Sequence, residues 1–442
     1  MTNIKIPKRV STAIINSMTA GVVPRIGLEH IAVGRKKEIE TILRDLENIS
    51  EGAAAFRFIA GRYGSGKSFL LQVIRNYAMD RDFVVADVDL SPEKRLSGSG
   101  NQGLATYREL MQRLSTKLRP DGGALEAIFQ KWINNIRLNI IQTGVLANDP
   151  KINELIESKI IEIITSMEEY AHGFDFANVL SIYYKAYSQG DDELKQASIK
   201  WLRGEFATKT EAKANLPVGE IISDDNWYEY IKLFASFIAQ VGYQGLVVFV
   251  DESVNLYKIS NRQSRENNYE KLLSMFNDTM QGKVESLGIY MAGTPQFIED
   301  ERRGLYSYAA LKSRLADSRF AKDGYIDFNS PIIRLQQLTD EEIFLLLERL
   351  TDVHAQHYGY VSSIKDGNIV AFMQIVLGQL GANELLTPRE ITRDYLGLLN
   401  IMQQDPSVTF EQLIHAEGFK VSTLSSSKEH EEADDEFAMF EL

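Results

Sequence analysis

The hydrophobic residues of this chain fall into short, nearly continuous runs separated by long stretches of helical periodicity. The runs, at residues 56–60, 83–90, 245–250, 287–293 and 332–335, are bounded by glycine or polar residues. Runs of this kind are typical of strands in a parallel sheet that is buried on both faces. The sequence therefore predicts an α/β fold in which helices cover a parallel sheet.

Two long stretches carry apolar residues at helical spacing. Residues 104–222 contain several such stripes, the first of which is Tyr107, Leu110, Leu114 and Leu118. Stripes of this kind bury one another, so this stretch is expected to form a helical bundle. The second stretch opens with a capping box at Thr339 and Glu342 and continues to about residue 424.

The first apolar run leads into a segment that matches the phosphate-binding motif G-x-x-x-x-G-K-[ST]. A helical pattern follows, and this strand–loop–helix context makes a chance match in a glycine-rich turn the weaker interpretation. Glycines let the backbone close around a polyphosphate, so that N–H groups and the helix N-terminus face the negative charge. Lys67 is expected to reach the β- and γ-phosphates, and the Ser68 hydroxyl to bind Mg²⁺. The candidate ATP-binding residues of this loop are Gly61, Tyr63, Gly64, Ser65, Gly66, Lys67, Ser68 and Phe69.

Two carboxylates end the apolar run at residues 245–250. Asp251 is expected to hold Mg²⁺ through water, and Glu252 to polarise the attacking water as a general base. An apolar run followed by Asp-Glu is common by itself, but downstream of a phosphate loop it predicts ATP hydrolysis. Thr294 follows the next strand, where its hydroxyl either orients the water or γ-phosphate or simply closes a turn.

Several cations follow these motifs. The segment 301–322 interleaves arginine and lysine with aromatic residues, so it could supply an arginine to a neighbouring subunit's nucleotide or bind nucleic acid. Arg389 and Arg393 could be ordinary surface cations or could lean onto bound phosphate. Lysines near Trp201 could contact nucleic acid, but a solvated face around a packed tryptophan is the preferred interpretation.

Composition narrows the function classes. The chain has 442 residues, no cysteine and a net charge of −13, which excludes disulfides and argues against a generally nucleic-acid-coated surface. His354 and His357 form H-x-x-H without a third ligand nearby, so we interpret them as part of a solvated helix face. No secretory leader or membrane span of about 18 apolar residues is visible, so we expect a soluble cytoplasmic protein without a membrane partner.

The order of these parts resembles the AAA+ ATPases, especially their origin-recognition-like branch. The shared elements are Val33-Gly34-Arg35 with Glu38, the loop from Gly61 to Ser68, Asp251-Glu252, the strand before Thr294, Ser313-Arg314-Leu315 and Pro388-Arg389-Glu390. More narrowly, Asp87-Val-Asp-Leu-Ser-Pro followed by Tyr107-Arg-Glu-Leu resembles the ATP-binding protein family of BREX and related bacterial phage-defence islands.

This resemblance implies roles for particular residues. Ile31 and Val33 would line the adenine, Thr294 would be sensor 1 and Arg389 sensor 2. Arg314 would be the arginine finger, with Arg319 as the alternative. The helical stretch at 104–222 departs from a minimal AAA+ core, and no winged-helix domain is evident after the C-terminal helices.

We therefore expect a P-loop NTPase (AAA+-like) parallel-sheet core with a large helical insertion, followed by a helical lid domain. The expected domains are a helical segment at 1–30, the core at 31–335 with its insertion at 104–222, the lid at 336–424 and an acidic disordered tail at 425–442. The apolar end of that tail suggests a docking peptide, with no role at all as the alternative.

The expected function is Mg²⁺-dependent ATP hydrolysis that drives homo-oligomer assembly and remodelling of a partner in DNA-directed phage defence. The partner would be another protein of the system, such as a helicase or nuclease, and DNA remains a candidate ligand. Three alternatives stay open: a nucleic-acid motor or loader, a slowly hydrolysing nucleotide switch, and an AAA+ regulator of transposition.

Overall fold

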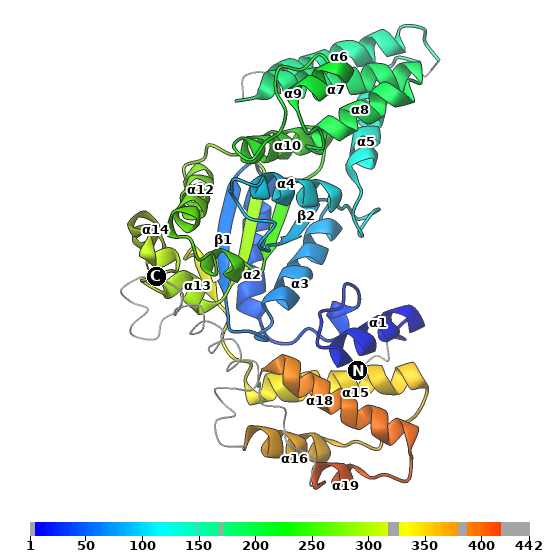
Figure 1. Cartoon of the computed structure of the whole chain (residues 1–442). Coiled ribbons are helices and arrows are strands. Elements are labelled where there is room, and N and C mark those ends of the chain that lie inside the picture. The colour runs from blue at the N-terminus through cyan, green and yellow to red at the C-terminus, as the bar shows by residue number, and fades with distance from the viewer. Residues whose placement is uncertain (1–4, 147, 168–170, 317–326, 379–386, 417–442) are drawn as a thin grey trace. The chain divides into compact units, whose positions relative to one another are not determined.

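The computed structural model describes residues 5–146, 148–167, 171–316, 327–378 and 387–416. The chain divides into two compact units (Figure 1). The sheet unit comprises Lys36–Gly61 and Ile74–Arg334, and the terminal unit comprises Met1–Arg35, Arg62–Val73 and Leu335–Leu442. Arg319 and the acidic tail at 425–442 lie outside the described residues.

The sheet unit is built on a five-stranded parallel sheet with the strand order β2-β3-β4-β1-β5. The strands are β1 (Ala54–Ala60), β2 (Val84–Asp89), β3 (Leu246–Asp251), β4 (Leu287–Gly293) and β5 (Ile332–Arg334). The predicted parallel sheet is thus confirmed, and each apolar run forms one strand. Because all strands point the same way, their carboxyl ends meet at one edge, here called the carboxyl edge, and their amino ends meet at the opposite amino edge.

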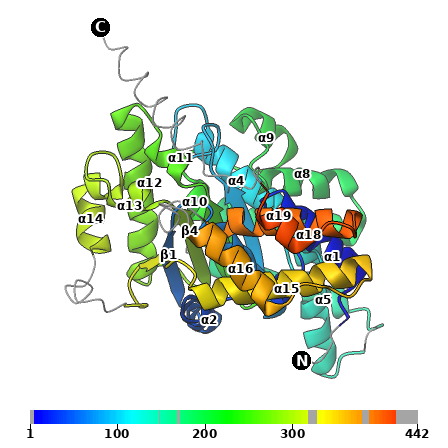
Figure 2. The ribbon, with the colours of Figure 1, turned by 90° about the horizontal axis from the view of Figure 1, so that it is seen from below.

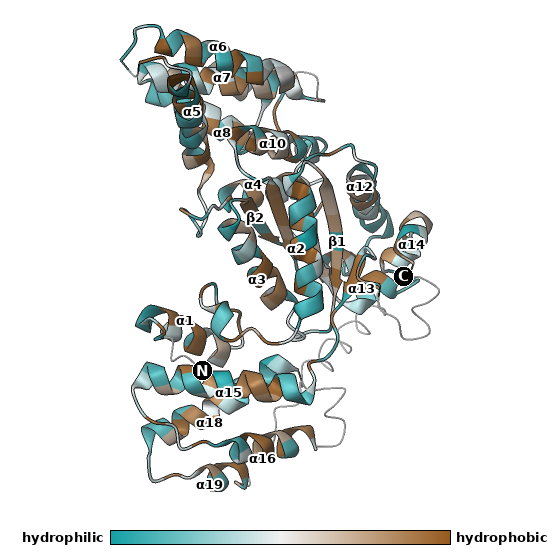
Figure 3. Ribbon diagram, turned by 180° about the vertical axis from the view of Figure 1, so that it is seen from behind, coloured by the Kyte–Doolittle hydropathy of each residue, from teal (hydrophilic) through white to brown (hydrophobic). Residues whose placement is uncertain are grey.

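Side-chain alternation along β1 explains how helices cover both faces of the sheet. Phe56 and Phe58 point to one face and pack with Phe276 of α12 (Arg262–Met280), the ring centroids lying 5.7 and 6.4 Å from that of Phe276. Arg57 points to the other face, where Asp45 of α2 (Lys36–Ser50) accepts two bonds from it at 2.7 and 2.8 Å. Figure 3 shows α2 across this face, with its polar side turned outward.

Helices occupy most of residues 104–222, and they lie on the amino-edge side of the sheet (Figure 1). The predicted apolar stripe is wrong at its end, because the first helix stops at Gln112 and Leu118 is 92% exposed. They are α4 (Gln102–Gln112), α5 (Leu125–Gln142), α6 (Ile152–Met167), α7 (Gly173–Gln189), α8 (Asp192–Leu202) and α9 (Lys209–Asn215). Rings of α5 and α7 meet Phe237 of α10 (Trp227–Val241) in a shared aromatic core. Trp201 is 1% exposed and Lys200 pairs with Glu211 at 2.6 Å, which confirms the interpretation of a packed tryptophan.

Short elements complete the sheet unit around the carboxyl edge and α12. They are α11 (Val254–Tyr257), α13 (Pro295–Glu299), η2 (Leu305–Ser307) and α14 (Ala309–Leu315). The amino-terminal half of α3 (Lys67–Asp80) belongs to the terminal unit and the rest to the sheet unit.

The terminal unit packs an N-terminal helix with C-terminal helices around one apolar cluster, and Figure 2 shows these helices together. Its helices are α1 (Lys8–Thr19), η1 (Leu28–His30), α15 (Asp340–Tyr358), α16 (Asp366–Leu377), α18 (Pro388–Gln404) and α19 (Phe410–Ile414). The predicted capping box at Thr339 and Glu342 is confirmed, and a second one, at Thr387 and Glu390, opens α18. Local cap signals therefore set where these helices begin.

The interpretation of His354 as part of a solvated helix face is wrong. His354 is fully buried, and its ring nitrogens bond Tyr360 Oη at 2.8 Å and Asn400 Oδ1 at 3.1 Å. Burial lowers the pKa of His354, so the neutral ring is favoured. Tyr360 lies just beyond the end of α15 and Asn400 lies on α18, so the H-x-x-H spacing does not indicate either partner. Among the described residues, no group of three histidine, aspartate or glutamate side chains is arranged to hold a metal ion.

Candidate active site at the carboxyl edge

The sheet brings the predicted carboxylates and Thr294 to the edge where the phosphate loop begins. Asp251 ends β3, Thr294 follows β4, and Gly61 follows β1. The Gly61 N–H donates to the Gly293 carbonyl at 3.1 Å, which ties the start of the loop to the end of β4. Parallel sheets bind ligands at this edge, so the predicted residues converge where a site is expected.

The phosphate loop has the backbone that its glycines predict. Gly64 and Gly66 have φ angles of 72° and 93°, a region that favours glycine, and α3 begins at Lys67. A Cβ atom on Gly64 would lie 2.4 Å from Thr387 Oγ1, so the loop packs directly against the first turn of α18. The Arg35 guanidinium donates to the Ser65 carbonyl at 3.1 Å. Residues from an N-terminal and a C-terminal segment of the chain therefore contact the loop within the terminal unit.

The side chains of the loop suit a triphosphate. Lys67 Nζ donates to the Arg62 carbonyl at 2.8 Å and lies 5.4 Å from the centroid of the Tyr63 ring. Ser65 Oγ is buried and has no hydrogen-bond partner among the described residues, as expected of a hydroxyl that serves a ligand oxygen. The Ser68 hydroxyl and the Asp251 carboxylate are hard oxygen donors of the kind that Mg²⁺ prefers. These residues fit ATP with Mg²⁺.

The apolar residues assigned to the nucleotide lie in or against the apolar cluster of the terminal unit, and Arg389 lies elsewhere in this unit. Ile31 is 1% exposed and Val33 is 9% exposed, and both pack with the C-terminal helices. Phe69 packs against the same cluster. Arg389 lies against Gly21, since a Cβ atom there would come within 2.9 Å of its Nε.

Glu252 adopts a backbone conformation that is unusual for a side-chain-bearing residue. Its φ angle is 54°, and such left-handed residues cost on the order of 1–3 kcal/mol and cluster at functional sites. Its N–H donates to Asp251 Oδ1 at 2.8 Å. The next residue, Ser253, is fully buried, and its hydroxyl has no hydrogen-bond partner among the described residues. The predicted base therefore has a strained backbone, and the buried Ser253 hydroxyl follows it without a hydrogen-bond partner among the described residues.

Sequence analysis missed the charges that β2 adds to this edge. Asp89 pairs in register with Asp251, and desolvation together with the Asp251 carboxylate raises the pKa of Asp89. Two residues earlier, on the same face of the strand, Asp87 bonds Arg75 at 2.9 Å and Arg113 at 3.0 Å. The only sequence signal was the alternation Asp87-Val-Asp89 at the end of an apolar run.

Thr294 and Arg314 both have local partners. The Thr294 hydroxyl caps α13 by accepting the Phe297 N–H at 3.2 Å, which is the turn role foreseen as the alternative to sensor 1. Arg314 is exposed on α14 and donates to Asn277, in the last turn of α12, at 2.8 Å and to the Ala310 carbonyl at 2.8 Å. Both of these bonds are made to residues of α12 and α14.

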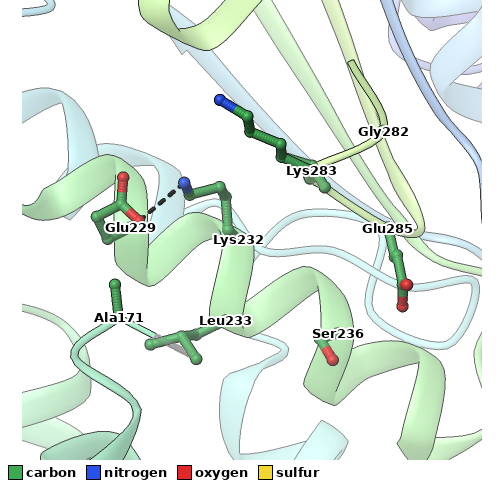
Figure 4. A pocket seen from close by; sticks show the side chains of 9 residues that line it. Ala171, Glu229, Lys232, Leu233, Ser236, Gly282, Lys283 and Glu285 are labelled. Atoms are coloured by element: carbon green, nitrogen blue, oxygen red, sulfur yellow. Dashed lines mark ion pairs between the residues drawn. The ribbon is translucent and has the colours of Figure 1, made fainter. Parts of the chain in front are cut away.

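A cavity of about 300 Å³ lies elsewhere in the sheet unit, between α10 and the segment that precedes β4 (Figure 4). Because this segment leads into the start of β4, the cavity belongs to the amino edge. Lys232 on its wall pairs with Glu229 at 2.8 Å and with Asp278 at 3.1 Å. The charge of Lys232 is thus neutralised by neighbours on the protein.

A comparison with protein families finds a match over nearly the whole chain. The model of the BREX system ATP-binding proteins BrxC/D matches residues 6–418. A comparison with curated proteins finds no match. In the described part of the chain, every helix is too short or too polar to cross a membrane.

Proposed function

Because the chain belongs to the BREX system ATP-binding protein family of phage defence, we propose that it is a Mg²⁺-dependent ATPase. Its ATP cycle would drive the assembly of several copies and the remodelling of another protein of the defence system, such as a helicase or nuclease. The observation that carries the proposal concerns Glu252, which directly follows Asp251 at the carboxyl edge. This residue brings a carboxylate to the edge and has a strained backbone conformation. A nucleotide-binding protein without hydrolysis would have no need of a base at this position.

In the proposed reaction, the phosphate loop and Lys67 hold the β- and γ-phosphates and neutralise part of their charge. Ser68 and Asp251 would hold Mg²⁺, which when bound would withdraw charge from the phosphate oxygens. Glu252 accepts a proton from the attacking water as the water adds to the γ-phosphorus and the bond to the β,γ-bridging oxygen breaks. Thr294 would orient that water while its oxygen caps α13.

Arginines would neutralise the remaining negative charge of the transition state. Arg389 comes from the terminal unit, as does the loop, and Arg314 would come from a second copy. An arginine supplied by a neighbouring subunit raises the rate in related NTPases, and this would couple hydrolysis to assembly.

The test is ATP turnover by the purified chain and by two variants. Glu252→Gln should keep ATP binding and lose turnover by about two orders of magnitude or more, because it removes the base. Lys67→Ala should instead weaken binding. Turnover near the wild-type rate in Glu252→Gln would remove Glu252 from the mechanism. Rates measured with and without DNA separate a protein-remodelling ATPase from a nucleic-acid motor, which DNA would stimulate.

A further inference from the structure

The peptide groups on either side of Glu252 are held by side chains. Its N–H donates to Asp251 Oδ1, as described above, and its carbonyl accepts two bonds from Asn255. One comes from the Asn255 backbone N–H at 3.0 Å, which is an ordinary bond of the first turn of α11. The other comes from Asn255 Nδ2 at 3.1 Å and is additional to that turn.

The same amide group also reaches the neighbouring strand. Asn255 Nδ2 donates to the Leu90 carbonyl at 2.8 Å, and Leu90 directly follows β2. Both acceptors are carbonyl oxygens, so the amide must present its nitrogen, whose two hydrogens suffice for both bonds. Leu90 is itself fixed, because its N–H donates to the Asp251 carbonyl at 3.0 Å. Asn255 therefore ties the Glu252 carbonyl to a rigid part of the sheet.

Glu252 needs such a tie because its φ angle of 54° is strained. A strained residue keeps its conformation only where its surroundings hold it, and relaxation of φ would turn the carboxylate in another direction. A shift of about 1 Å in a reacting group can cost up to a hundredfold in rate. The Asn255 side chain does not itself need to touch ATP to have this effect.

From these contacts we infer that Asn255 is a positioning residue for Glu252, which holds the general base in its strained backbone conformation. The inference rests on the proposed role of Glu252 in hydrolysis. We therefore expect Asn255 to affect the rate of the chemical step and to have no effect on the affinity for ATP.

Two substitutions test the inference on the full chain. Asn255→Ala removes the amide, and Asn255→Asp keeps its size but replaces the donor by an acceptor. Each should lower kcat by about ten- to a hundredfold and leave the affinity for a fluorescent ATP analogue within about twofold of wild type. Added to Glu252→Gln, Asn255→Ala should cause no further loss of rate, because there is no base left to position.

Asn261→Ala is the matched control. Asn261 is also an asparagine that follows β3, but its side chain caps α12 by accepting the Ser264 N–H at 2.8 Å. This variant should lower the thermal midpoint and leave kcat unchanged.

The outcomes separate this inference from the proposed function. If Glu252→Gln is inactive but a folded Asn255 variant turns over ATP at the wild-type rate, the positioning role is wrong and the proposed chemistry stands. If Glu252→Gln itself is active, the proposed chemistry fails first. If neither Asn255 variant gives a cooperative thermal transition, Asn255 is a structural residue and the inference is overturned.

Discussion

The two edges of the sheet differ in the arrangement of their charged residues, although both contain ion pairs. At the amino edge, Lys131 pairs with Asp82 at 3.0 Å and Lys232 lies between two carboxylates. At the carboxyl edge, the carboxylates of Asp89 and Asp251 adjoin each other in register, and Glu252 is held in a strained conformation. Strain is present at both edges, since Asp82 and Ser286 at the amino edge have φ angles of 62° and 53°. Like charges side by side are unfavourable for folding, so the Asp89–Asp251 pair supports our proposal that the carboxyl edge serves a ligand.

The largest predicted effect concerns Arg314, which we propose acts at the carboxyl edge of a neighbouring copy. If Arg314 acts on the nucleotide of a neighbouring copy, Arg314→Ala should lower turnover by about a thousandfold. A mixture of Arg314→Ala and Lys67→Ala proteins should regain part of the activity, because some interfaces then pair an intact loop with an intact arginine. The measurement is the ATPase rate of each variant alone and of the mixture.

Lys312→Ala provides the control for Arg314. Lys312 lies on the same short helix and pairs with Glu301 at 2.8 Å, with 46% of its side chain exposed. Its loss should leave turnover unchanged, since an exposed ion pair contributes little. Wild-type activity of Arg314→Ala, or a monomer at every ATP concentration in light scattering, would contradict the shared site.

Groups at the amino edge should affect stability alone. Lys131 Nζ lies 3.4 Å from the centroid of the Tyr243 ring and also pairs with Asp82. Lys131→Ala should lower the free energy of unfolding by about 1 kcal/mol through loss of both contacts, with kcat unchanged. Urea unfolding and ATPase assays on the same preparation check this. A fall in kcat with unchanged stability would mean that the amino edge also acts on the reaction.

The strands and the phosphate loop could be predicted because their signals are local. Each strand is one apolar run, and the loop needs glycines at positions whose φ is positive. Contacts between distant segments could not be predicted: the Asp87–Arg113 pair, the burial of His354 and the bond from Asn255 to Leu90 join residues that only the fold brings together. The association of the phosphate loop with Arg35 and Thr387 belongs to the same class.

The smallest predicted effect tests whether the carboxylate pair at the carboxyl edge costs stability. The pKa of Asp89 is raised from its ordinary value of 3.8, so the folded chain binds the proton more tightly than the unfolded chain. Ionisation of Asp89 at higher pH therefore lowers stability, by an amount that its exposure keeps small. Asp89→Asn removes this cost and should stabilise the fold by a few tenths of a kcal/mol at pH 8, with the gain shrinking as the pH falls toward about 4.

The neighbouring carboxylate on the same strand should give the opposite result. Arg113 also pairs with Asp89, at 3.6 Å, but it keeps Asp87 at 3.0 Å and Glu109 at 2.6 Å when Asp89 is replaced, so Asp89→Asn leaves no cation unpaired there. Asp87→Asn instead takes a charged partner from Arg75, which is 4% exposed, and should destabilise the fold by about 3 kcal/mol at pH 8. Urea midpoints of both variants at pH 8 and near pH 4 decide the matter. If Asp89→Asn destabilises the fold at pH 8 as Asp87→Asn does, the carboxyl edge holds its charges in stabilising pairs, and the contrast with the amino edge disappears.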